Sequence, residues 1–312
     1  MHFNKLDLNL LVALDAMLAE RGISRAAERL HMSQSAMSNA LARLRDYFDD
    51  ELLVQVGRKM ELTPRAESLL EPVREVLVRV DTTIAARPLF EPAKSDREFR
   101  IFISDYTMMT LMPHLLVLAH EQASNVRFEF LPQTDNPQRA LERGEADLLL
   151  IPKGYCSPDH PIEPLFEEEF CCAVWSDSAL AKKDLTFDAY VAAGHVVMQP
   201  PGGAKSFEAW FMERFGMTRR VEVTTFSFAS APHLVVGTER IATVHGRMGL
   251  LARKSLPLKL FPPPVPMPKM EQVVQWHKYR TQDPGLIWLR EVLRRAVLRM
   301  DAKPDAERPA DL

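Results

Sequence analysis

The chain has 312 residues, of which 46% are hydrophobic and 26% are charged, and its formal net charge is −3. This length and apolar content are sufficient for two or three domains with cores of their own. The charge excludes a strongly basic nucleic-acid coat protein, although a DNA-binding protein needs only a local positive face. No apolar run is long enough to span a membrane and residues 1–5 lack a signal-peptide pattern, so we expect a cytoplasmic protein without a membrane partner.

A helix-turn-helix is predicted in the first fifty residues. Leucines recur at helical spacing in an amphipathic first helix that ends near Gly22: Leu8, Leu11, Leu14 and Leu18. Ser24 is then a candidate N-cap for a short helix over residues 25–30, and Ser33 is a candidate N-cap for the helix after the next turn. The two later helices and their turn occupy residues 23–48.

The helix after Ser33 has one apolar face and one bare polar face. The apolar face consists of Met37, Leu41, Leu44 and Phe48. The polar face carries Gln34, Ser35, Ser38, Asn39 and Arg43. Gln and Asn can bond adenine edges, Arg can bond guanine, and Ser can bond a base or a phosphate. The pattern favours a helix that reads the major groove of double-stranded DNA, and the alternative is an ordinary solvated surface.

A hairpin is predicted directly after this helix. Residues 52–62 read as two short strands around a Gly57-Arg58-Lys59 turn, so that Arg58 and Lys59 lie at the tip of a wing. Other arginines suited to phosphate contacts surround the two helices and the end of the wing: Arg21, Arg25, Arg29, Arg43, Arg45 and Arg65. We therefore expect a winged helix-turn-helix domain over residues 1–62.

A long helix follows the wing and serves as a linker over residues 63–87. Thr63-Pro64 reads as an N-cap and an N1 proline, and Pro72 should bend the helix near its first turns. One broad apolar side includes Leu70, Val73, Leu77 and Val80. A partner helix in a dimer would cover this side, and the alternative is that it packs inside its own chain.

Beyond a proline-bearing hinge at residues 88–98, short strands and helices alternate, which indicates an α/β domain. Strands are expected at 99–104, 126–131, 147–151, 170–175, 195–199, 220–225, 241–244, 258–261 and 271–276. Helices are expected at 108–122, 136–143 and 284–299. Two sets of strands and a return to the first set indicate a two-lobed, periplasmic-binding-protein-like domain with a ligand cleft. We expect lobe I at about 99–169 and 268–300, lobe II at about 170–267, and a disordered tail at 301–312.

Polar side chains at strand ends are candidates for the ligand cleft. Ser104, Asp105, Tyr106 and Thr107 end the first strand of this domain at a helix start, where hydroxyls and free backbone donors favour a phenolate or a carboxylate. Thr134 follows the next strand. The alternative is that Ser104 and Thr134 only cap helices.

The chain resembles the LysR-type transcriptional regulators in Leu6 to Leu11, Ser24 to Leu30, Ser33 to Ser38, Arg43-Leu44 and Leu62-Thr63-Pro64. It departs from the usual family pattern at Arg45-Asp46, where Leu-Glu is usual, and at Arg65-Ala66-Glu67. Both departures are typical of the branch that contains the nodulation regulator NodD and aromatic-catabolism regulators similar to NahR. The chain also resembles this branch in Met1 to Phe3, Phe128 to Pro132, Phe166 to Glu168 and Gly237 to Ile241.

This resemblance implies a ligand-responsive activator that works as a dimer of dimers and contacts RNA polymerase. It implies an interrupted palindrome as the DNA site, and two-fold symmetry places the half-sites about one helical turn apart. It further implies effector contacts at Phe226, Ser227, Phe228 and His245, whose rings could stack on a planar ligand, unless the phenylalanines belong to the core. The co-inducer would be a small aromatic, and a flavonoid and a salicylate-like acid both remain open.

Enzymatic readings find little support in the sequence. It has no Gly-rich phosphate loop, no His-Glu-x-x-His and no Gly-x-Ser-x-Gly elbow, so we expect neither a catalytic residue nor a cofactor. Cys156 is isolated and Cys171 and Cys172 are adjacent, which predicts free thiols and no metal site. A small-molecule receptor without DNA binding is a further alternative, which the N-terminal third contradicts.

Overall fold

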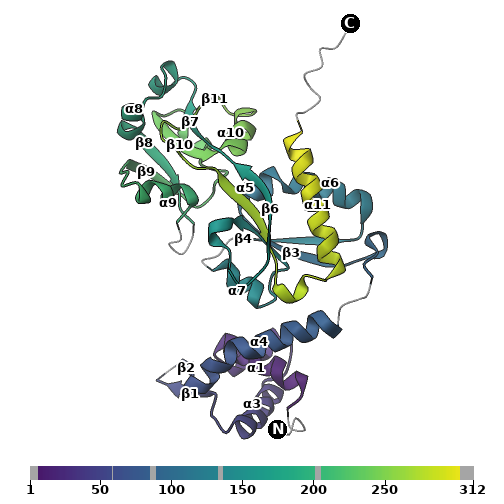
Figure 1. Cartoon of the computed structure of the whole chain (residues 1–312). Coiled ribbons are helices and arrows are strands. Elements are labelled where there is room, and N and C mark those ends of the chain that lie inside the picture. Colours follow the sequence, from purple (N-terminus) through teal and green to yellow (C-terminus); the bar gives the residue numbers. More distant parts are fainter. Residues whose placement is uncertain (1–5, 58, 85–88, 133–135, 201–204, 303–312) are drawn as a thin grey trace. The chain divides into compact units, whose positions relative to one another are not determined.

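In this computed structural model, the described residues are 6–57, 59–84, 89–132, 136–200 and 205–302. They divide into two compact units, Met1–Ala86 and Arg87–Leu312 (Figure 1). The elements of the first unit are α1 (Leu8–Glu20), α2 (Ile23–Arg29), α3 (Gln34–Phe48), β1 (Leu53–Val56), β2 (Lys59–Leu62) and α4 (Pro64–Ile84). Helix α4 continues through Pro72.

The first unit has the predicted helix-turn-helix and hairpin. The Ser33 hydroxyl accepts a hydrogen bond from the amide of Ala36 at 3.2 Å and caps α3, as expected. The predicted cap at Ser24 is wrong, because α2 begins one residue earlier, at Ile23, and Gly22 precedes it. Leucines of α1 pack against the apolar face of α3 in one core, which includes Leu10, Leu14, Leu18, Met37, Leu41 and Leu44.

The apolar side of α4 is partly covered by its own unit. Val73 is 5% exposed and lies in the core, and Leu70 and Leu77 are partly buried against that core. Arg74 is also buried and forms an ion pair with Asp15 of α1 at 3.1 Å. Val73 is therefore not available to a partner helix in this arrangement, contrary to the expectation from the sequence, because α1 packs on the same face of α4.

The second unit contains two five-stranded sheets, which define lobe I and lobe II (Figure 1). Lobe I has the order β4-β3-β5-β12-β6 and lobe II has the order β11-β7-β10-β8-β9. The strands of lobe I are β3 (Glu98–Ile103), β4 (Arg127–Pro132), β5 (Leu148–Pro152), β6 (Ile162–Glu168) and β12 (Met270–Gln275). Those of lobe II are β7 (Phe170–Trp175), β8 (Gly194–Met198), β9 (Arg220–Thr225), β10 (Arg240–His245) and β11 (Leu258–Phe261). The chain thus completes most of lobe I, builds lobe II and returns to lobe I at β12, as predicted.

Both sheets are mixed, and one edge strand of lobe I was not predicted from the sequence. In lobe I, β3 runs parallel to β4 and β5, and β12 runs antiparallel to β5 and β6. In lobe II, β8 runs parallel to β9 and β10, and β7 runs antiparallel to β10 and β11. Strand β6 was not predicted because it contains Pro164, which a sheet tolerates at its edge, where β6 lies.

Helices cover the sheets of both lobes. They are α5 (Asp105–Thr110), α6 (Met112–Gln122), α7 (Pro137–Glu142), α8 (Phe187–Ala192), α9 (Phe207–Arg214), α10 (Gly246–Arg253) and α11 (Pro284–Asp301). The predicted single helix over 108–122 is two helices that meet at Leu111, because Pro113 lies in the first turn of α6 and has no amide hydrogen to donate.

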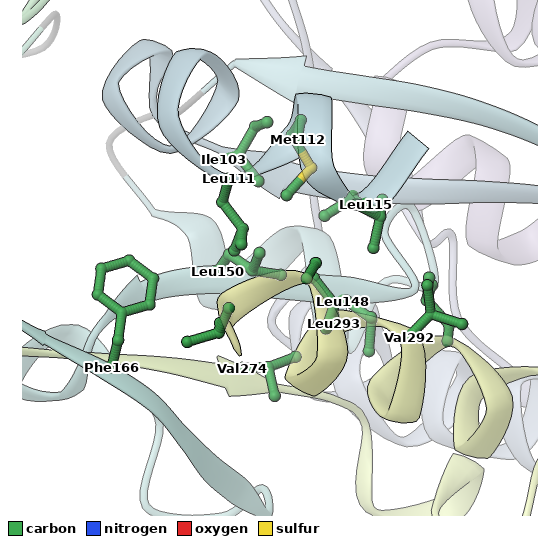
Figure 2. Packing of buried hydrophobic residues seen from close by; sticks show 14 of the residues in the cluster. Ile103, Leu111, Met112, Leu115, Leu148, Leu150, Phe166, Val274, Val292 and Leu293 are labelled. Atoms are coloured by element: carbon green, nitrogen blue, oxygen red, sulfur yellow. The ribbon is translucent and has the colours of Figure 1, made fainter. Parts of the chain in front are cut away.

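The largest core lies in lobe I, where α6 and α11 contact each other. Figure 2 shows its apolar side chains meeting between helices and strands, with labels on Ile103, Leu111, Met112, Leu115, Leu148, Leu150, Phe166, Val274, Val292 and Leu293. Smaller cores stabilise lobe II. Within the described residues, every helix is too short or too polar to cross a bilayer.

Gly249 allows α10 to pack closely on the sheet of lobe II. A Cβ atom at this position would lie 2.5 Å from the Cys171 sulfur and 3.4 Å from the Leu260 methyl carbons.

We expect Gly249→Ala to lower the free energy of unfolding by about 1–3 kcal/mol through overpacking, as measured by chemical denaturation. Combining it with Cys171→Ala should recover most of that loss. Additive losses in the double variant would show that this contact is not the cause.

Candidate functional site

The polar face of α3 is open to solvent along its length. Gln34, Ser35, Ser38, Asn39 and Arg43 are all exposed, whereas the opposite face of the helix is buried in the core of the first unit. Ser33, at the cap, is exposed as well and its hydroxyl lies 3.0 Å from that of Ser35. The helix therefore presents hydrogen-bonding side chains to solvent, which is the requirement for reading base edges.

Exposed cations are present on the same unit. Arg25 is exposed and donates to the carbonyl of Glu20, and Lys59 is exposed at the start of β2. Arg43 forms an exposed ion pair with Asp7 at 3.2 Å. The Leu10 amide and the Arg43 guanidinium hold the pKa of Asp7 below its usual value. Arg58, the other predicted wing-tip cation, lies outside the described residues.

Two adjoining cavities lie between lobe I and lobe II. The inner cavity has a volume of about 110 Å³ and the outer one about 390 Å³. They share the lining residues Ser104, Met198, Pro200 and Phe228. Only the outer cavity reaches the usual size of a small-molecule site by itself, and the two together form a cleft with room for a ligand of more than one ring.

The predicted effector residues are distributed over this cleft. Ser104, Tyr106, Phe228 and His245 line the inner cavity, and Ser104, Asp105, Phe226, Ser227 and Phe228 line the outer one. Thr107 is completely buried, bonds to Ser104 and Gln272, and lines neither cavity, so its prediction as an effector contact is not supported by its position. Thr134 lies outside the described residues.

Aromatic rings form one wall of the inner cavity around His245. The imidazole of His245 stacks on Tyr106 with ring centroids 4.0 Å apart, and Phe170 and Phe228 lie within 5.1 Å and 4.8 Å of it. Burial lowers the pKa of His245 to about 3, and its Nδ1 atom has no hydrogen-bond partner among the described residues. The wall is therefore uncharged at neutral pH.

Tyr106 also joins the wall of the cavity to a buried charge. Its hydroxyl donates to the carboxylate of Glu168, which is 1% exposed and accepts from the backbone amide of Arg247 at 3.2 Å and from its Nη1 at 2.8 Å. Arg247 also bonds to Asp301 at the end of α11. Burial and the Glu168 charge raise the pKa of Tyr106, so the phenol stays protonated.

Asp105, next to Tyr106, makes a further polar contact between the lobes. The Asp105 carboxylate of lobe I accepts from the Ser227 hydroxyl at 2.6 Å and from the Ala229 amide at 3.0 Å, both of lobe II. Ser227 therefore uses its hydroxyl to connect the lobes. Asp105 thus joins the lobes directly, Tyr106 does so through Glu168 and its partner Arg247, and both residues line the cleft.

Charged groups that line the inner cavity are paired. Glu208 is buried and bonds to Arg219, whose side chain is 8% exposed. Lys205 pairs with Glu213 at an exposed position. Among the described lining residues, no buried cation is left for a ligand carboxylate.

Sequence reasoning missed several residues of the inner cavity, namely Tyr155, Phe170, Phe207, Lys205, Glu208 and Gln272. They come from separate segments of the chain, and no local pattern joins them. The interlobe role of Glu168 and Arg247 was missed as well, because the two residues are far apart in the sequence.

No metal site is evident in the part of the chain that the structure describes, where no three His, Cys, Asp or Glu side chains are grouped to hold an ion. The three cysteines are free thiols. Burial raises the pKa of Cys171 and Cys172 to about 12, which leaves both as protonated, unreactive side chains.

Comparisons with known sequences cover both units. Residues 8–67 match the family described as bacterial regulatory helix-turn-helix protein, lysR family, and residues 93–298 match the LysR substrate binding domain. Nodulation protein D 1 of Mesorhizobium japonicum is 41% identical over 99% of this chain and 98% of its own length. Nodulation protein D 2 of Rhizobium leguminosarum bv. phaseoli is 42% identical over 96% of this chain and 95% of its own length.

Solved structures agree with these matches. A probable transcriptional regulator from Pseudomonas aeruginosa is 27% identical, with a TM-score of 0.64 over 94% of this chain and 97% of its own. A full-length OxyR variant from the same organism is 19% identical, with a TM-score of 0.71 over 96% of this chain and 99% of its own, and it shows the shared fold. The protein belongs to the LysR family of DNA-binding transcriptional regulators, whose members act on genes and are not enzymes.

Proposed function

We propose that this regulator is a cytoplasmic activator that responds to a small, neutral, planar aromatic compound of the flavonoid type. The observation that carries the proposal is the cleft between the lobes, which has aromatic walls and whose described lining lacks a buried, unpaired cation. Since the relatives at about 40% identity are called nodulation protein D, nodulation genes are the first candidate targets.

The chemistry of the cleft favours a neutral ligand over an aromatic acid. A carboxylate that leaves water needs a cation or several hydrogen-bond donors to replace its hydration. Arg219 is engaged by Glu208, and His245 is neutral. A phenol needs only single hydrogen bonds, which Ser104 and Gln272 are placed to offer, and its ring can stack on the aromatic wall.

A salicylate-like acid, with genes of aromatic catabolism as targets, is the second candidate. It is favoured by Lys205, whose ammonium group lines the inner cavity and whose partner Glu213 is exposed and easily exchanged for a ligand carboxylate. The two candidates differ in the charge of the ligand and can be separated by direct binding.

DNA recognition follows from the first unit. We propose that α3 reads base edges through its exposed polar face while Arg25, Arg58 and Lys59 contact phosphates. Dimers form through the exposed remainder of the α4 face, which includes Val76 at 45% exposure, and pair further through their effector domains. Such a dimer of dimers fits an interrupted palindrome with half-sites about one helical turn apart.

The mechanism follows from linkage between ligand and lobe arrangement. Ser104, Asp105 and Tyr106 line the cleft. Asp105 bonds to Ser227 of the other lobe, and Tyr106 bonds to Glu168, which pairs with Arg247 of the other lobe. Ser104 directly precedes these two residues. A ligand that binds one lobe arrangement better than the other shifts the population toward it by its differential affinity. The shift changes the spacing of the DNA-binding units, and with it the DNA bend and the contact with RNA polymerase.

Substitutions on the α3 face separate base reading from phosphate contact. Gln34→Ala and Ser38→Ala should each weaken binding to the specific DNA site by about 1–3 kcal/mol and leave binding to random DNA unchanged. Lys59→Ala should weaken both DNAs alike and lower the slope of affinity against salt by about 1. Gel-shift titrations at several salt concentrations measure both effects. A lower melting temperature for Gln34→Ala would instead place that side chain in the fold.

Calorimetric titration of the full-length protein tests the effector class. A hydroxyflavone should bind at least roughly tenfold more tightly than salicylate, and Phe228→Ala should weaken the flavone by about 1 kcal/mol through the lost ring contact. Phe187→Ala, at an exposed position on α8 outside both cavities, is the matched control. Tighter binding of salicylate, abolished by Lys205→Met, would establish the second candidate.

A further inference from the structure

The backbone turns sharply between the end of α3 and the start of β1. Asp49 ends the helix with φ +51°, and Leu52 has φ +59° with its side chain completely buried. A left-handed conformation is unfavourable for a bulky L residue and persists only where neighbouring contacts hold it. Specific contacts must therefore stabilise this turn.

One carboxylate fixes the turn to the beginning of α4. The Asp50 Oδ1 atom accepts from the Leu52 amide at 2.7 Å and from the Thr63 hydroxyl at 2.6 Å. The Thr63 hydroxyl oxygen in turn accepts from the Ala66 amide at 3.1 Å, and the Thr63 amide donates to the Leu52 carbonyl at 3.1 Å. Asp50 thus joins the end of α3 directly to the N-cap of α4.

Arg45 holds the same turn from the side of α3. Its Nε donates to the Glu51 carbonyl at 2.8 Å and its Nη2 donates to the Leu53 carbonyl at 3.0 Å. The guanidinium also pairs with the Glu51 carboxylate at 2.9 Å. These donors of Arg45 therefore bond to the turn of its own chain.

A second polar contact holds α4 further along the helix, against α1. Arg74 is 3% exposed and lies 3.1 Å from Asp15 of α1, which belongs to the same core as α3. Polar contacts at Thr63 and Arg74 therefore supplement the apolar packing of α4 on the helix-turn-helix core.

We infer that Asp50 and Arg45 are positioning residues that set the direction of the DNA-reading helix α3 relative to α4, and that they thereby determine which half-site spacing the dimer accepts. The inference rests on the proposed pairing through α4. In such a dimer, the direction of each α3 relative to its own α4 fixes how far apart and at what angle the two α3 helices lie. DNA with another spacing must then be bent or twisted to fit.

The test measures binding of the full-length protein to its own intergenic DNA, with the half-sites first located by footprinting. A series of duplexes then inserts or deletes one to three base pairs between the half-sites. The unmodified protein should lose at least roughly tenfold in affinity for a shift of two base pairs, which rotates one half-site by about a fifth of a turn. Asp50→Ala should flatten this profile to less than roughly threefold and weaken binding at the native spacing.

Two matched variants distinguish positioning from a general effect of charge or folding. Asp50→Asn keeps the acceptor oxygen for Leu52 and Thr63 and should retain the spacing profile. Asp49→Asn removes the same charge at the adjacent exposed residue, tolerates a left-handed conformation, and should leave the profile unchanged. If Asp50→Ala does not fold by circular dichroism, Thr63→Val replaces it, with Thr63→Ser as its conservative partner, and the same criteria apply.

Each outcome decides one claim. A flat profile for Asp50→Ala or Thr63→Val, with retention in the conservative variants, supports the inference. A sharp profile in Asp50→Ala equal to that of the unmodified protein overturns it. A flat profile in the unmodified protein contradicts the proposed pairing through α4 instead, so the two failures cannot be confused.

Discussion

The effector domain depends on how its two sheets are held together beside a cleft. The amino-terminal end of α5 takes part in two of the polar contacts between them: Asp105 accepts from Ser227 and Ala229, and Tyr106 donates to Glu168, which pairs with Arg247 of lobe II. Charged groups buried between the lobes must be paired, because a buried charge without a partner has a desolvation cost that nothing offsets. The same constraint makes the cleft responsive, since a ligand that contacts Ser104 and Tyr106 acts directly on the residues that join the lobes.

A similar principle organises the DNA-binding unit. Apolar side chains of α1, α3 and α4 build one core. Hydrogen bonds to one carboxylate, Asp50, and the buried ion pair of Arg74 with Asp15 add directional contacts between α4 and the rest of the unit. Non-directional burial thus provides stability, and directional polar contacts provide the geometry that DNA recognition needs.

Sequence reasoning succeeded where a local pattern determines the structure. The apolar period of α3, the Ser33 cap, the wing and the return of the chain to the first lobe were predictable, because each depends on neighbouring residues or on the sequence of elements. Sequence reasoning failed where the structure depends on contacts between segments that are far apart in the sequence. Nothing local showed that Val73 faces α1, that β6 tolerates Pro164 as an edge strand, or that Phe170, Phe207 and Gln272 meet at one cavity. The Asp50 contacts were likewise hidden, since they join residues 13 positions apart.

The central claim is that an aromatic ligand in the cleft changes how a sequence-specific regulator binds DNA. Fluorescence anisotropy of the full-length protein, with the intergenic DNA beside its own gene and with random DNA of equal length, tests it when each is titrated with and without a hydroxyflavone. We predict a preference for the intergenic DNA of at least roughly a thousandfold, and a change in that binding or in its salt dependence when the flavone is present. Equal affinity for both DNAs, or specific binding that no aromatic compound alters, would contradict the account.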